Sequence, residues 1–90
     1  MAIRIQIPTP MRQHTQGKAT VEAGGTTVQS VFDDLGRQFP AITQRIFDNG
    51  QVRRFVNVYL NDEDIRFLGG ERSALKDGDK LLLVPSIAGG

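Results

Sequence analysis

The feature that most restricts the fold is a run of four apolar residues at positions 81–84, close to the end of the chain. The run is too short for a helix, and its continuous apolar character is typical of a strand in the middle of a sheet. Residues 3–7 and 18–22 alternate between apolar and polar side chains, as strands with one buried face do. Residues 55–60 predict a further strand, and residues 65–67 a short one. The sequence therefore predicts a sheet of four to five strands.

One segment has the period of a helix. Apolar residues recur every three or four positions over residues 28–39, and Thr26 with Gln29 fits a capping box at the start. Pro40 ends this helix, because proline clashes with the preceding turn. Residues 41–47 are expected to form a further short helical turn that buries two isoleucines.

The order of these elements predicts the fold class. One main helix across one face of a mixed sheet, with the last strand beside the first and parallel to it, is the simplest packing. This is an α+β, ubiquitin-like β-grasp domain over residues 1–85, followed by a flexible tail over residues 86–90 that ends in Gly-Gly. Turn signals predict the connections: a hairpin connection before residue 18, a polar turn over 61–64, a helical turn over 73–75 and a tight turn over 76–79.

Composition excludes several classes of function. Eleven Lys and Arg against ten Asp and Glu give a net charge of +1 over 90 residues, which excludes broad electrostatic binding to nucleic acids or acidic membranes. The absence of cysteine excludes disulfides, thiolate metal sites and side-chain sulfur chemistry. The sequence has neither the run of about 18 apolar residues that spans a bilayer nor a signal-peptide pattern, so we expect the cytoplasm.

The side chains offer little chemistry. His14 stands alone in a predicted loop, and the acidic residues 62–64 lack the spacing of a calcium loop and are expected to form a solvated turn. Arg53 and Arg54 form a basic pair at the entry of a strand, and Gly24 with Gly25 lacks the rest of a phosphate-binding loop. We therefore expect no metal site, no bound cofactor and no catalytic residue: the chain is not predicted to be an enzyme.

The remaining reactive group is the C-terminal carboxylate of Gly90. It ends a five-residue tail that, fully extended, reaches about 17 Å beyond the fold. Gly89 and Gly90 have no Cβ, so another protein's backbone can approach them closely. With Ile87 and Ala88, they have the properties needed to thread a chain end into a narrow active site.

A partner surface is predicted beside the tail. Strand alternation directs Val56, Val58 and Leu60 towards the helix, and with them Leu81 and Leu83. The opposite face then carries an apolar patch that marks a docking surface. Its expected residues are Tyr59, Leu82 and Val84, with Phe67 and Pro85 at its margin.

The last sixteen residues resemble the C-terminal signature of the ThiS/MoaD sulfur-carrier family. The shared elements are the turn Leu75-Lys76-Asp77-Gly78-Asp79, an apolar strand, Pro85, three spacer residues and the terminal Gly-Gly. Residues 7–9, 54–59 and 60–67, with Gly69-Gly70, resemble the CysO-like branch of that family, whose members carry sulfur for cysteine synthesis. The resemblance covers nearly the whole chain.

The resemblance implies a carrier that other enzymes act upon. An E1-like adenylating enzyme, using ATP and magnesium, would join Gly90 to AMP, and a sulfur donor enzyme would then leave a thiocarboxylate on Gly90. In the CysO-like branch a PLP-dependent cysteine synthase receives this sulfur, and a zinc metalloprotease releases the cysteine formed on the chain end. Thiamin thiazole, molybdopterin, tRNA thiolation and thio-siderophores remain alternative destinations. A ubiquitin-like protein modifier or a plain β-grasp adaptor are the alternative classes.

Overall fold

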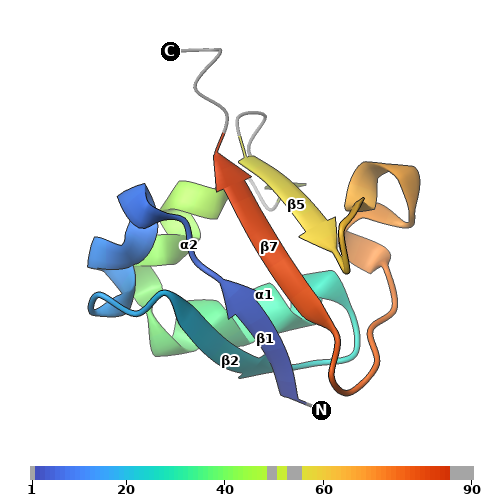
Figure 1. Ribbon diagram of the computed structural model, residues 1–90, viewed down its shortest axis with the longest axis horizontal. Coiled ribbons are helices and arrows are strands. Elements are labelled where there is room, and N and C mark those ends of the chain that lie inside the picture. Colours follow the sequence, from blue (N-terminus) through green and yellow to red (C-terminus); the bar gives the residue numbers. More distant parts are fainter. Residues whose placement is uncertain (1, 49–50, 53–55, 86–90) are drawn as a thin grey trace.

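The computed structural model describes residues 2–48, 51–52 and 56–85 (Figure 1). Its elements, with η denoting a 3-10 helix, are β1 (Ala2–Gln6), η1 (Thr9–Thr15), β2 (Thr20–Gly24), α1 (Val28–Gln38), α2 (Pro40–Ile46), β3 (Phe47–Asp48), β4 (Gln51–Val52), β5 (Val56–Leu60), β6 (Glu63–Asp64), η2 (Ile65–Phe67), η3 (Gly70–Arg72) and β7 (Lys80–Pro85). No helix in these ranges has the length and apolar character needed to cross a bilayer.

The main sheet has five strands in the order β2-β1-β7-β5-β6. The apolar run forms the central strand β7, which pairs in parallel with β1 and antiparallel with β5. β1 and β2 form an antiparallel pair, as their alternation predicts. β3 precedes residues 49–50 and β4 follows them. These two strands pair antiparallel in a separate two-stranded sheet. The predicted α+β, ubiquitin-like β-grasp arrangement with a sheet of four to five strands is confirmed.

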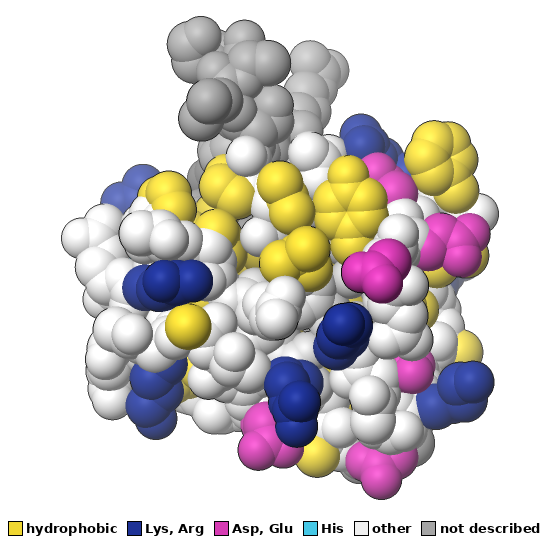
Figure 2. Space-filling view, viewed as in Figure 1, with side chains coloured by type: hydrophobic (Ala, Val, Ile, Leu, Met, Phe, Trp, Pro, Cys, Tyr) yellow, Lys and Arg dark blue, Asp and Glu magenta, His cyan; other side chains and the backbone are white. Residues whose placement is uncertain are grey.

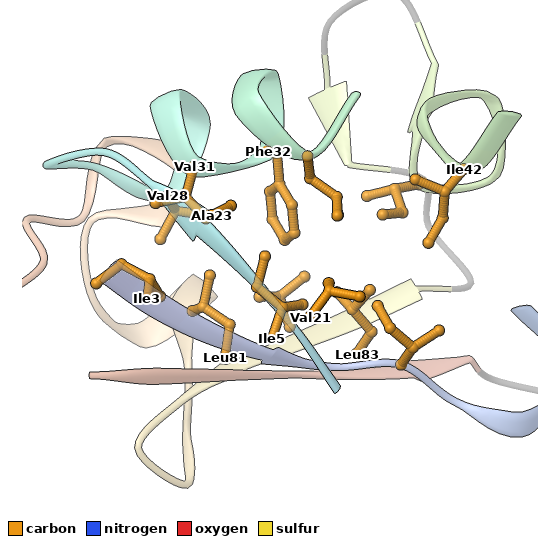
Figure 3. Close-up of a cluster of buried hydrophobic side chains, with 14 of the residues drawn as sticks. Ile3, Ile5, Val21, Ala23, Val28, Val31, Phe32, Ile42, Leu81 and Leu83 are labelled. Carbon is orange, nitrogen blue, oxygen red and sulfur yellow. The ribbon is translucent and has the colours of Figure 1, made fainter. Parts of the chain in front are cut away.

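The core lies between the sheet and α1, which crosses one face of it (Figures 1 and 3). Four side chains of α1 are buried at its sheet-facing side: Val28, Val31, Phe32 and Leu35. Ile3 and Ile5 from β1 and Leu81 and Leu83 from β7 meet them from the sheet. Val56 and Val58 are buried and Leu60 packs against the cluster, so the predicted inward face of each strand is confirmed.

The helix begins at Val28, where the apolar period starts, but its capping residue lies one position later than the sequence predicts. The capping box joins Thr27 to Ser30, not Thr26 to Gln29: the Thr27 hydroxyl accepts from the Ser30 amide at 3.1 Å, and the Ser30 hydroxyl accepts from the Thr27 amide at 3.0 Å. Gln29 instead donates to Asp33 one turn further along. Pro40 ends α1 as predicted and begins α2, where its missing N–H is not needed. The expected burial of Ile42 and Ile46 on α2 is confirmed.

The connection between β1 and β2, predicted as a hairpin connection, contains the 3-10 helix η1. η1 buries Met11 and Thr15, so this segment belongs to the core. The Thr15 hydroxyl lies 3.2 Å from the Arg12 carbonyl and 2.9 Å from the Lys18 carbonyl, which ties the end of η1 to the approach to β2.

Three predictions about the second half of the chain are wrong. Only Asn61 and Asp62 form the turn after β5, both with positive φ, and β6 follows at once. Residues 65–67 are a 3-10 helix and not a strand, because the Asp64 carboxylate caps it by accepting from the Arg66 amide at 2.9 Å. The helical turn predicted at 73–75 lies at Gly70–Arg72, and Ser73 is already extended.

Candidate functional site at the end of strand β7

β7 places the end of the chain. The strand is hydrogen-bonded to β1 on one side and β5 on the other, and its last residue, Pro85, lies opposite Val56. The chain therefore leaves the domain from the middle of its sheet. Ile87, Ala88, Gly89 and Gly90 lie outside the described residues, so their role in threading and activation stays a prediction, as does the boundary between domain and tail.

The turn before β7 fixes where that strand starts. Gly78 has a φ of 91°, in the left-handed region that favours glycine. The buried Asp79 carboxylate accepts from the Lys76 amide at 2.8 Å and from the Asn61 side-chain amide at 3.0 Å. These hydrogen bonds, the Lys76 bond first, hold the pKa of Asp79 below its usual value. Asn61 also accepts from the Lys80 amide at 3.2 Å, so one polar cluster joins the turn after β5 to the beginning of β7.

The predicted patch lies on the face of the sheet opposite α1. Tyr59 on β5 pairs directly with Leu82 on β7, and Val84 follows on the same face of β7, opposite Asn57. All four side chains are half-buried. Figure 2 shows hydrophobic side chains gathered at the end of this face where β7 finishes, whereas charged side chains occupy the other end. The structure thus brings Tyr59, Leu82 and Val84 together beside the exit of the chain.

Phe67 stands at the margin of this face. It is 81% exposed, and the adjacent Leu68 is 42% exposed, which makes them the exposed large hydrophobic side chains of the described residues. Beside them, Arg66 donates to the Asp64 carboxylate at 2.7 Å and to the Asn57 side-chain oxygen at 2.9 Å. The Arg66 side chain, and then its backbone amide, hold the pKa of Asp64 below its usual value. Arg66 therefore links η2 to the open face of β5.

The other sequence candidates show no metal or catalytic cluster in the described part of the chain. His14 lies half-buried on η1 and not in an open loop. The prediction of a solvated turn at 62–64 is wrong for Asp64, which is buried and paired. Across the ranges that the structure describes, no three His, Asp or Glu side chains gather in a way that could hold a metal ion. Arg53 and Arg54 lie outside those ranges.

Sequence reasoning missed two residues, Asn61 at the beginning of β7 and Arg66 near its end. Asn61 has a φ of 48°, and asparagine is one of the few residues that adopts this conformation readily, so its position after a strand was a usable signal. Arg66 gave no such signal, because its role depends on Asn57 lying next to it across the sheet.

Comparisons with known proteins agree with this geometry. The profile of the ThiS family matches residues 5–90. The sulfur carrier protein CysO of Mycobacterium tuberculosis is 43% identical over 93 residues, covering 100% of both chains. A chain in the crystal structure of the Amycolatopsis orientalis BexX/CysO complex is 44% identical with a TM-score of 0.92, and the match covers 98% of this chain and 99% of that one. The small archaeal modifier protein 1 of Methanosarcina acetivorans is 25% identical with a TM-score of 0.88, covering 99% and 96%. Fold, central C-terminal strand and full-length similarity together show that the chain belongs to the ThiS family.

Proposed function

We propose that this protein is a sulfur carrier whose Gly90 carboxylate is adenylated and then converted to a thiocarboxylate. The observation that carries the proposal is the similarity to sulfur carrier protein CysO over the whole of both chains. The central position of β7, which delivers the chain end from the middle of a rigid sheet, supports it.

The chemistry needs no side chain of the carrier. The terminal carboxylate is an anion at neutral pH and a poor electrophile, so an E1-like partner must activate it. The carboxylate oxygen attacks the α-phosphorus of ATP, pyrophosphate leaves, and a mixed anhydride with AMP forms. A sulfur nucleophile delivered by the donor enzyme then attacks the acyl carbon and AMP leaves, so sulfur ends on Gly90. The carrier is a substrate in both steps, and ATP and magnesium belong to the partner.

Cysteine synthesis is the proposed destination of the sulfur, because the Mycobacterium tuberculosis relative that is 43% identical over the whole of both chains is a CysO protein. A PLP-dependent cysteine synthase would take the sulfur onto an activated serine derivative, and an acyl shift would leave cysteine attached to Gly90. A zinc metalloprotease would then release it.

A protein modifier is the second candidate function. The small archaeal modifier protein 3 of Haloferax volcanii is 34% identical over 64 residues, covering 71% of this chain and 70% of that protein. A modifier would use the same activated carboxylate but end in an amide bond to a lysine of another protein.

Intact mass separates these functions. The carrier purified from its native host should gain the mass of one sulfur less one oxygen, and it should lose this gain when Gly90 is deleted or Gly89 is replaced by Phe. Both variants should keep the melting temperature of the wild type, because the tail follows the last described residue of β7. Normal adenylation of the chain lacking Gly90 would contradict the proposal, and a covalent adduct with a whole protein would favour the modifier.

A further inference from the structure

The edges of the main sheet differ in how they are covered. At the outer edge of β2, the Gln38 side chain donates to the Glu22 carbonyl at 3.0 Å, and the Asp34 carboxylate accepts from the Gly24 amide at 2.9 Å. Side chains of α1 thus occupy backbone groups that another strand would need. The opposite edge, β6, has only two residues. Neither edge offers a long free strand.

The open position lies beside the C-terminal half of β7. The pairing of β1 with β7 ends at Gln6 and Leu82, because β1 stops there and η1 begins at Thr9. In the described part of the chain, the residues of β7 after Leu82 therefore have β5 on one side and no strand on the other. The space beside them is a hollow of about 400 Å³.

This hollow has a mixed lining with one cation. Pro8, Leu82, Val84 and Pro85 supply apolar surface, and Gln6, Thr9 and Thr20 supply polar side chains, while Ile7 and Leu83 also line it but are buried in the core. Arg12 lines it from η1, and its Nε donates to the Ile7 carbonyl at 3.0 Å, which holds the guanidinium beside the strand end. Leu82 and Val84 also belong to the apolar patch, so the hollow continues that surface.

A second hollow, of about 380 Å³, lies between η1 and α2 and shares Pro85 with the first. Its lining includes Met11, His14 and the exposed Arg45. None of the residues that line either hollow is an Asp or a Glu, although the chain has ten of them. Pro85 is therefore flanked by two arginines and by linings that hold apolar and neutral polar side chains but no carboxylate.

We propose that the hollows on both sides of Pro85 bind an extended acidic segment of the adenylating enzyme. An enzyme that acts on Gly90 must approach the domain at Pro85, where the tail begins. An extended segment fits the position that β1 leaves open beside β7, its apolar side chains fit the lining, and its carboxylates face Arg12 and Arg45. The inference rests on the proposed function, because it names the surface through which the tail-processing partner holds the carrier.

Charge reversal tests this surface. The probe is the purified E1-like adenylating enzyme of the source organism, and its affinity is measured for the wild type, for Arg12→Glu with Arg45→Glu, and for Arg45→Glu alone. We expect about tenfold weaker binding of the double variant at low salt, and a smaller difference at high salt because ions screen exposed charges. Arg72→Glu, an exposed arginine on η3 outside both linings, is the matched control and should bind within about twofold of the wild type.

Two further variants separate docking from folding and from chemistry. Arg12→Lys loses the hydrogen bond to Ile7 but keeps the charge, so it should bind like the wild type; binding as weak as that of the double variant Arg12→Glu with Arg45→Glu would overturn the inference. The same charge reversals made in a chain lacking Gly90, which cannot be adenylated, should weaken binding by the same factor. The proposed docking surface is wrong if the adenylating enzyme binds Arg45→Glu, Arg72→Glu and the wild type with equal affinity. This holds even where Gly90 is adenylated normally. Absence of adenylation in the wild type, with salt-sensitive binding retained, would refute only the proposed function.

Discussion

Replacing Asp79 by Ala should destabilise the domain more than any other change in the turn before β7. The carboxylate accepts two hydrogen bonds, from the Lys76 amide at 2.8 Å and from the Asn61 side chain at 3.0 Å, and Asp79 is 8% exposed. A hydrogen bond to a charged group contributes about 1.5 kcal/mol or more, so the loss of both should lower the free energy of unfolding by about 3 kcal/mol. For a domain of this size, that loss lowers the melting temperature by roughly 12–24 °C.

Thermal and urea unfolding at pH 7, followed by circular dichroism, measure this loss. Asp77→Ala is the control in the same turn, because Asp77 is exposed and accepts one bond, from the Ala2 amide at 3.2 Å. It should cost less than about 1 kcal/mol. Since hydrogen bonds lower the native pKa of Asp79, its contribution is present above the usual pKa of an aspartate and disappears as pH falls through the native value. The wild type and Asp79→Ala should therefore converge in strong acid. A loss at pH 7 no larger than that of Asp77→Ala would refute the reasoning.

Three other perturbations have definite outcomes. Gly78→Ala should lower the free energy of unfolding by about 1–2 kcal/mol in urea titrations, because φ is 91° while no atom lies within 4 Å of the added Cβ; an unchanged midpoint would contradict a backbone origin. Gln38→Ala uncovers the Glu22 carbonyl at the edge of β2 and should increase self-association measured by light scattering at high concentration, whereas the neighbouring Arg37→Ala should not. Wild-type stability should fall as pH drops below about 4, because hydrogen bonds lower the native pKa values of Asp34, Asp64 and Asp79 and the unfolded chain then binds more protons; stability that is constant down to pH 2 would contradict this.

The spacing of apolar residues was sufficient to predict those helices and strands whose position depends only on which side chains are buried. The alternation of Ile3 and Ile5 and the spacing of Val28, Val31 and Leu35 reported directly which surfaces are buried. The parallel pairing of β1 with β7 also followed, because a helical crossover between two strands of one sheet imposes it. The layers of the fold and the central place of β7 in the sheet could therefore be predicted.

Polar side chains that bind the backbone were harder to predict. Ser30 and Gln29 are both plausible partners for a capping threonine, and only the register of the helix selects Ser30. Asp64 had no signal that distinguished it from its two acidic neighbours, since its burial depends on Arg66 folding back over it. For the candidate site, the alternation of β5 and β7 predicted the apolar patch, whereas the hollows beside Pro85 depend on where η1 packs.

The arrangement of β7 has a mechanical consequence. A pull applied at Pro85 along the axis of β7 acts across its backbone hydrogen bonds, which run perpendicular to the strand towards the antiparallel β5 and slanted towards the parallel β1. Such bonds are loaded in shear and must break together, whereas bonds at a frayed edge strand would open one after another. Under the proposed function, an adenylating enzyme that pulls on the chain end would load these bonds in shear, and the domain would stay folded while it does so.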